Sequence, residues 1–290
     1  MKTVTYAYRN FNKIVRDALK LFKWYEWASI TAIGWAFPFE LVGILTSIAI
    51  YYFYTFSISI GRVKLEGFDP IHYIVIGLFA RSLLNITLYV VYESVISMYR
   101  GFFGIGGVRM STADYLRNFG ISIYSHILAD LISIYIRESI ASSLYLFVGL
   151  AFYGLTLPPP DKLLLVIVVL IMGSIASLGL GFLIGSTVWF SGVLIYKSPI
   201  IWFIDILVSL ASSAYFPVEM LPSWLRPFSY ILPHFYCIKT IRALFNPSIS
   251  EIPLDHIITL FIYMLVSISI GLVVFHIVYK RRGAAPFSLL

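Results

Sequence analysis

A glycine-rich polar stretch between two apolar runs is the first part of this sequence that could do chemistry. It covers Tyr99–Phe119, YRGFFGIGGVRMSTADYLRNF, and its glycines are Gly101, Gly104, Gly106 and Gly107. A phosphate loop needs a strand before such glycines and Gly-Lys-Ser/Thr after them. The tripeptide is absent, no strand is predicted there, and GIGG does not continue into a dinucleotide fingerprint. We therefore expect no ATP site and no other cofactor on this chain.

Three charged residues stand inside apolar runs that are long enough to cross a membrane: Glu40, Arg81 and Asp205. A charge at the centre of a bilayer costs free energy, so such residues are usually paired or functional. Arg81 could form an ion pair with Glu40 or with Asp205, or it could line a path for a polar substrate. The presence of partners of opposite sign favours an ion pair, and the sequence leaves the choice of partner open.

The other reactive side chains do not form an enzyme site. Cys237 is the single cysteine, which excludes an internal disulfide and a cysteine-based zinc site. The five histidines lack metal-ligand spacing, and no paired aspartates or Ser-Lys dyad stand at usable spacing in the apolar runs. We predict no catalytic residue and no metal site, and an intramembrane enzyme is the class that the sequence supports least.

The composition is typical of a membrane protein. Of the 290 residues, 60% are hydrophobic and 12% are charged, and the mean hydropathy is +0.89. Soluble domains contain about 25% charged residues, whereas a spanning helix needs about 20 mostly apolar ones. We predict an all-α integral membrane protein, a single transmembrane domain over residues 1–290 with six spans. The predicted spans are residues 30–57, 71–98, 126–157, 163–190, 200–215 and 257–279.

Small residues recur at every fourth position in the fourth predicted span. They are Gly173, Ser177, Gly181 and Gly185. This spacing places them on one helical face, where small side chains let another helix approach closely. We predict that this face packs inside the protein rather than binding a substrate.

Residues 1–27 predict an amphipathic helix. Its apolar face carries Phe11, Ile14, Val15, Ala18, Phe22 and Tyr25, and its charged face carries Lys13, Arg16, Asp17, Lys20 and Lys23. A mainly cationic face suits a helix that lies on the cytoplasmic surface of the bilayer. The alternative is a solvated flank of the first span. The start is too polar for a signal peptide, so we expect the first span to direct insertion.

Basic residues predict the orientation of the spans. With the N-terminus inside, the inner segments hold 13 lysines and arginines and the outer segments hold six. Positive residues are enriched on the cytoplasmic side of membrane proteins. We therefore predict a multi-pass protein of the cell membrane with both termini in the cytoplasm.

The segment Ala211–Phe245 breaks the helical pattern. Within 17 residues it carries Pro217, Pro222, Pro227 and Pro233, with aromatic residues between them. Proline removes a backbone donor and clashes with the preceding turn, which excludes one straight helix. Non-helical backbone at membrane depth must be buried in protein or line a cavity. We predict a re-entrant hairpin of two short helices joined near Pro222–Pro227, and a plug that only seals the fold is the alternative.

The order of residues in this segment resembles the outer hairpin of type-2 ABC exporter permeases (the ABC-2 type). In that family an FP-x-x-x-LP element lies between spans five and six, followed by a proline and a basic residue. The matching residues here are Phe216, Pro217, Leu221, Pro222, Pro233 and Arg242. The resemblance implies that the hairpin is an outer gate. It also implies a dimer with a second permease, identical or paralogous, and two copies of a separate ATPase subunit that binds ATP and Mg²⁺.

The same family carries a coupling helix in the loop between spans two and three, here residues 99–119. Ser111 fits an N-cap and Asp114 fits a first turn, which predicts a helix over Ser111–Asn118. The resemblance implies that this helix docks into the ATPase subunit. The residues implied in docking are Arg109, Ser111, Asp114, Tyr115 and Arg117. A solvated loop is the alternative.

Together these features predict the transmembrane subunit of an ATP-driven exporter, without an ATP site of its own. Its cargo is expected to be a lipid, a lipid-linked glycan, a drug or another amphipathic molecule. Membrane lipid is an expected partner and nucleic acid is not. An ATP-independent channel or transporter with six spans is the alternative. The sequence leaves open the cargo and whether the two permeases are identical.

Overall fold

The computed structural model of the chain describes residues 11–23, 42–49, 68–100, 102–105, 108–191, 199–247, 249 and 252–282. This part is largely helical, and four of its helices are long and apolar enough to cross a membrane. They are α2 (Pro70–Arg100), α4 (Ile123–Phe152), α5 (Pro160–Ser186) and α10 (Leu254–Arg282). They coincide with the second, third, fourth and sixth predicted spans. Most of the first predicted span lies outside the described residues, and its residues 42–49 are helical.

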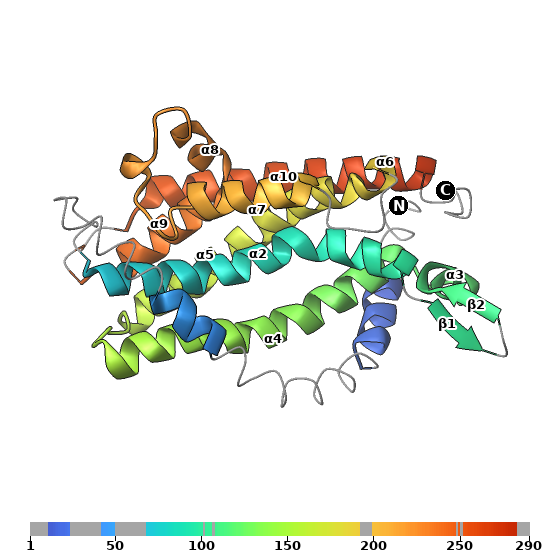
Figure 1. The fold of residues 1–290 in the computed structure, drawn as a ribbon, viewed down its shortest axis with the longest axis horizontal. Coiled ribbons are helices and arrows are strands. Elements are labelled where there is room, and N and C mark those ends of the chain that lie inside the picture. Colours follow the sequence, from blue (N-terminus) through green and yellow to red (C-terminus); the bar gives the residue numbers. More distant parts are fainter. Residues whose placement is uncertain are drawn as a thin grey trace, which may run out of the picture.

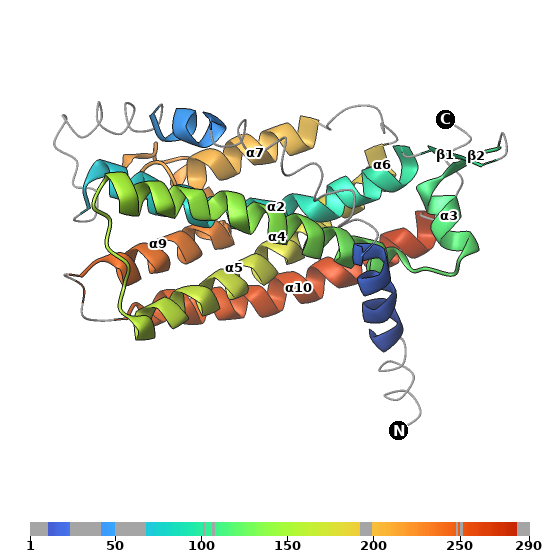
Figure 2. The same ribbon diagram turned by 90° about the horizontal axis from the view of Figure 1, so that it is seen from below.

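The four long helices run side by side along the long axis of the molecule (Figures 1 and 2). α2 packs against α4 and α5, and α5 packs against α10. Tyr73, Ile74 and Leu84 of α2 are buried in this bundle, whereas Phe147 of α4 and Val273 of α10 are exposed. A bundle with large apolar side chains on its outside as well as its inside suits a surrounding of lipid tails.

The small-residue face of α5 packs against α2, as predicted. A Cβ atom added at Gly181 would lie 2.7 Å from the carbonyl oxygens of Thr87 and Leu88. On another face of α5, a Cβ added at Gly179 would lie 2.5 Å from the backbone nitrogen of Ile268 in α10. These distances are too short for any side chain. Glycine therefore sets how closely α5 approaches both neighbours.

α7 (Pro199–Ala211) stands where the fifth span is predicted, but it is shorter. Its 13 residues extend about 20 Å, whereas the hydrocarbon of a bilayer is about 30 Å thick. The helix ends at Ala211 instead of Tyr215, because the chain turns at Ser213, whose φ is 62°. The described length of α7 is therefore less than the thickness of the hydrocarbon.

The proline-rich segment forms a 3-10 turn and two short helices. They are η1 (Val218–Met220), α8 (Arg226–Ile231) and α9 (Pro233–Phe245). Pro227 and Pro233 stand in the first turns of α8 and α9, where the missing N–H of proline costs no helical hydrogen bond. The break between the two helices falls at Leu232, and not within Pro222–Pro227 as predicted. α8 protrudes from the bundle, whereas α9 packs against α2, α5 and α10 (Figure 1).

One end of the bundle carries a small unit that follows α2, and we call it the α3 end. β1 (Phe102–Ile105) pairs antiparallel with β2 (Val108–Ser111), and α3 (Thr112–Asn118) follows directly. The helix agrees with the one predicted over Ser111–Asn118 and begins at Thr112, whereas the two strands were not predicted. The strands begin two residues after α2 and bring the chain back toward the bundle before α3 starts (Figure 1).

The helix over residues 11–23 lies at the α3 end and runs across the long axis of the bundle (Figure 2). Phe11 of its predicted apolar face is exposed. Ala18 is buried, whereas Lys20 and Lys23 are exposed. Lys13 Nζ donates to the carbonyl oxygen of Gly120 at 3.2 Å, which ties this helix to the loop between α3 and α4. The rest of predicted residues 1–27 lies outside the described part of the chain.

Candidate functional site

A row of polar residues follows one side of α2 from its middle toward the α3 end. The row is Arg81, Asn85, Tyr89, Glu93 and Ser97, each four residues from the next. Residues four apart are neighbours on a helix surface. Glu93 and Ser97 are exposed and the other three are half-buried, whereas Leu84 and Leu88 on the same helix are buried. The polar row therefore lies at an edge of the described bundle.

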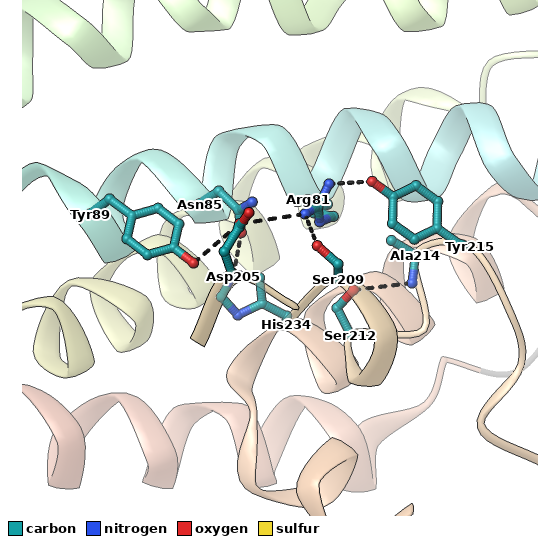
Figure 3. Close-up of polar contacts among 9 residues, drawn as sticks. All are labelled: Arg81, Asn85, Tyr89, Asp205, Ser209, Ser212, Ala214, Tyr215 and His234. Carbon is teal, nitrogen blue, oxygen red and sulfur yellow. Dashed lines mark hydrogen bonds and ion pairs between the residues drawn. The ribbon is translucent and has the colours of Figure 1, made fainter. Parts of the chain in front are cut away.

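Arg81 joins α2 to α7 and to the turn after it (Figure 3). Its guanidinium donates to the hydroxyl of Tyr215 and, at 2.5 Å, to Oγ of Ser209. Its Nη2 lies 3.8 Å from Oδ1 of Asp205. The Arg81 side chain is only 15% exposed, and its Cα lies about 17 Å along the helix from the first residue of α2. The charge therefore sits near the middle of the span.

Asp205 lies between Arg81 and Tyr89 (Figure 3), and the hydroxyl of Tyr89 donates to its Oδ1 at 3.3 Å. The Asp205 side chain is 54% exposed. The exposed α7 residues around it are Trp202, Phe203 and Ile206. A carboxylate facing lipid tails at mid-membrane depth is costly. This face therefore suits contact with protein, water or a polar ligand.

α9 reaches the same region through its first turn. Nε2 of His234 lies 3.2 Å from Oδ1 of Asn85 (Figure 3). His234 is fully buried, and its Nδ1 has no hydrogen-bond partner among the described residues. We call the polar side chains of α2 at this place, together with the α7 and Tyr215 side chains that contact Arg81 or Tyr89, the polar seam. Its members are Arg81, Asn85, Tyr89, Asp205, Ser209 and Tyr215.

A second arginine, Arg242 of α9, holds the turn that ends α7. It is fully buried, and its guanidinium donates to the backbone carbonyls of Tyr73 at 2.9 Å, Ser213 at 2.6 Å and Ala214 at 2.8 Å. Its Cζ lies 3.3 Å from the centroid of the Tyr73 ring. Carbonyl dipoles and an aromatic face offset the desolvation of a buried cation. The turn leads directly into Tyr215 of the polar seam.

The three predicted intramembrane charges have different outcomes. Arg81 and Asp205 lie together in the polar seam, and Glu40 lies outside the described residues. Among the residues that the structure describes, no group of three His, Cys, Asp or Glu side chains could hold a metal ion. The polar seam can bind and orient a polar group through one cation, one anion and several hydroxyls.

The residues matched to the outer hairpin are spread over the segment. Pro217 is buried, Phe216 is half-buried and Pro222 is exposed. Leu221 packs in a small apolar cluster with Val218, Leu225 and Phe235. Pro233 begins α9 beside the polar seam, and Arg242 lies near the other end of α9 in the core. These side chains shape the segment rather than forming one contact surface.

The residues implied in coupling lie at the α3 end. Arg109 and Ser111 belong to β2, and Asp114, Tyr115 and Arg117 belong to α3. Ala113 and Leu116 are buried in the cluster that contains Met98 of α2. Asp114 and Arg117 are exposed. α3 therefore turns its apolar side to α2 and a charged side away from the bundle.

Five residues of this region were not predicted as site residues: Asn85, Tyr89, Ser209, Tyr215 and His234. Two signals point to the first three, because Arg81, Asn85 and Tyr89 follow at four-residue steps, and so do Asp205 and Ser209. No sequence pattern indicates Tyr215 or His234. Tyr215 reaches the site through the turn after α7, and His234 reaches it through the break between α8 and α9.

The chain matches no model of a known protein family, and no curated protein sequence matches it closely.

Proposed function

We propose that this chain is the transmembrane subunit of an ATP-driven exporter of the type-2 ABC class. Its cargo is a lipid, a lipid-linked glycan, a drug or another amphipathic molecule, moved out of the cytoplasm or the inner leaflet. The chain has no ATP site of its own. ATP and Mg²⁺ bind to two copies of a separate ATPase subunit, and a second permease, identical or paralogous, completes the complex.

One observation carries this proposal: α2 connects the polar seam to the α3 end without a break. Arg81 lies near the middle of α2, and β1, β2 and α3 follow where this helix ends. α3 packs against α2 through Ala113 and Leu116 and exposes Asp114 and Arg117. A partner that binds the charged side of α3 would move the same rigid helix that carries the polar seam.

The transport path in this proposal follows the polar seam. Because the seam lies at an edge of the bundle and Asp205 is half-exposed, a second permease at this edge would enclose the charges in a cavity. α8 and α9 form a re-entrant hairpin that gates the outer side of this cavity. Two further spans, over residues 30–57 and 200–215, complete a count of six.

The α3 end faces the cytoplasm in this proposal, and so do both termini. The excess of lysine and arginine in the inner segments supports this orientation. The exposed cationic side chains of the helix over residues 11–23 lie at the same end. The membrane is the plasma membrane of the cell.

Two matched charge reversals test the proposal. Asp114 and Asp161 are both exposed and both stand in the first turn of a helix, but Asp114 is on α3 and Asp161 is at the opposite end of the bundle, on α5. The complex is purified from its native membrane in mild detergent, and its subunits and ATPase activity are measured. Asp114→Lys is expected to lower ATPase recovery or activity about tenfold, because a reversed charge opposes docking. Asp161→Lys is expected to change neither.

An ATPase subunit that copurifies with the wild-type chain and is lost or uncoupled in Asp114→Lys supports the proposal. If the wild-type chain purifies without any ATPase subunit, the ATP-driven proposal fails. An ATP-independent channel or transporter then takes its place.

A further inference from the structure

We propose that the Arg81–Asp205 pair binds the headgroup of a zwitterionic amphiphile, a molecule whose polar end carries one cationic and one anionic group. This inference rests on the proposed function, because it names the class of cargo that the polar seam accepts. The anionic group binds Arg81 and the cationic group binds Asp205. The apolar tail lies along the exposed side of α7.

The ion pair is loose, and each partner is held by neutral groups. Nη2 of Arg81 and Oδ1 of Asp205 are 3.8 Å apart, whereas a charge-assisted hydrogen bond measures about 2.7–2.9 Å. Arg81 is fixed by Tyr215 and Ser209, and Asp205 by Tyr89. Opening the ion pair therefore leaves both charges in position. A ligand that enters between them meets a preorganised site.

Both partners retain capacity for further hydrogen bonds. Nε of Arg81 is buried and has no hydrogen-bond partner among the described residues. The contacts that Asp205 makes with Arg81 and with Tyr89 both involve Oδ1, whereas a carboxylate has about four acceptor positions on its two oxygens. The guanidinium of Arg81 suits an anionic group such as a phosphate, and the remaining carboxylate oxygen of Asp205 suits an ammonium.

Charge balance selects a zwitterion over a singly charged ligand. The pair is neutral as a unit, and it lies at mid-membrane depth. An anionic headgroup that displaced Asp205 from Arg81 would leave the carboxylate without a counter-charge, and a cationic headgroup would do the same to the guanidinium. An uncompensated charge in a poorly hydrated site is expensive. A ligand with one charge of each sign replaces the Arg81–Asp205 ion pair with two ion pairs, one to each residue, so that no charge is left without a counter-charge.

The surroundings of Asp205 favour an amphiphile over a small soluble zwitterion. Trp202 and Phe203 are 62% and 63% exposed, and Ile206 is 56% exposed. These apolar side chains stand on the same helix, within three residues of the carboxylate. A site with a charged pair beside an apolar surface matches a molecule with a polar head and an apolar tail. The aromatic rings also suit a nearby ammonium group.

Three fluorescent probes with the same acyl chain and fluorophore test the inference. Their headgroups are phosphocholine (zwitterionic), phosphoglycerol (anionic) and trimethylammonium (cationic). Binding to the purified full-length chain is measured by fluorescence anisotropy in an uncharged sugar detergent, without ATP. The wild-type chain is expected to bind the phosphocholine probe about tenfold more tightly than either other probe, which corresponds to the cost of one unpaired charge at a half-exposed site.

Two single variants are expected to change the preference in opposite directions. Arg81→Gln removes the cation and shifts the preference toward the trimethylammonium probe. Asp205→Asn removes the anion and shifts it toward the phosphoglycerol probe. Glu219→Gln removes an exposed charge outside the polar seam and is the control, with the wild-type order of affinities expected.

The wild-type measurement alone can overturn the inference, whether or not the variants fold. Equal affinity for the three probes, or a preference for a singly charged probe, excludes a zwitterion site at this pair. A zwitterion preference that persists in both seam variants places the headgroup elsewhere and also overturns it. Because binding needs no ATP, a phosphocholine preference in a chain without an ATPase partner would uphold this site and refute the exporter. An active ATPase complex that shows no phosphocholine preference would support the exporter and exclude this zwitterion site.

Discussion

Arg242 donates a hydrogen bond of 2.6 Å to the backbone carbonyl of Ser213, the residue whose φ of 62° turns the chain at the end of α7. A positive φ is uncommon for a residue other than glycine and stores strain. The buried guanidinium also donates to the carbonyl oxygens of Tyr73 in α2 and of Ala214. These hydrogen bonds hold the turn in place and offset the strain at Ser213. α9 therefore anchors the turn between α7 and the proline-rich segment.

Truncation of Arg242 is expected to destabilise the protein strongly. Arg242→Ala leaves three carbonyl groups without their donor and opens a cavity, so we expect a loss of about 3–5 kcal/mol in the free energy of unfolding. Chemical unfolding in mixed micelles measures this loss.

Arg226→Ala is the matched control, because Arg226 also donates to two backbone carbonyls, those of Leu221 and Glu219, but at the surface. We expect about 1 kcal/mol or less for this change. Similar losses for the two variants would contradict the anchoring role of Arg242.

A single methyl group at Gly77 is expected to push α2 away from the anchored turn. A Cβ atom there would clash with the carbonyl oxygen of Ala214 and with Nη2 of Arg242. Gly77→Ala should cost about 1–3 kcal/mol, the range for overpacking a core. At Gly43 a Cβ atom meets nothing within 4 Å. Gly43→Ala should therefore be neutral or slightly stabilising, since alanine favours helix. Thermal unfolding of both variants measures these effects. A larger loss of stability for Gly43→Ala than for Gly77→Ala would refute the close approach of α2 to the turn at Ala214.

The Arg81–Asp205 ion pair should appear as an energetic coupling. Asp205→Asn leaves the largely buried guanidinium of Arg81 without its counter-charge, and Arg81→Gln removes the cation. We expect the double variant to lose about 1 kcal/mol less unfolding free energy than the sum of the losses in the two single variants, as for residues in direct contact. A double-mutant cycle in unfolding free energy measures this coupling. Additive losses would show that the charges do not interact.

Thiol labelling tests whether α4 crosses the membrane. The single native cysteine, Cys237, is fully buried, so the folded wild-type chain should not react with a membrane-impermeant maleimide. Asn118 and Asp161 are exposed and stand before and after α4. Asp161→Cys should be labelled in intact cells, and Asn118→Cys only in inside-out vesicles. Labelling of both positions from the same side would exclude a spanning α4.

The long helices were predictable because their signals are local. Long runs of mostly apolar residues define α2, α4, α5 and α10 in the sequence, and the four-residue recurrence of glycine and serine in α5 predicts its close packing. Pro233 likewise predicts a helix boundary, because a proline restricts its own backbone and that of the residue before it. Its position at the start of α9 follows from chain chemistry alone.

The partners of the polar groups depend on contacts between residues that are far apart in the sequence. Arg242 meets Tyr73 across 169 residues of sequence, and no local pattern specifies such a contact. The sequence presented Arg242 as a basic residue of an outer hairpin, whereas in the fold it is a fully buried anchor. Arg81 had two candidate partners of equal standing. The position of α7 brings Asp205 and Ser209 to it, and the turn after Ala211 brings Tyr215.

Hydropathy and proline act within a few residues, so the amino-acid sequence alone specifies which segments are apolar helices. The packing of α9 against α2 and α5 buries Arg242, whereas the position of α7 leaves Asp205 half-exposed at an edge. That outcome depends on the packing of whole helices. Glycines set the separation of the helices, and the buried Arg242 binds the carbonyl groups that the turn after α7 leaves without donors.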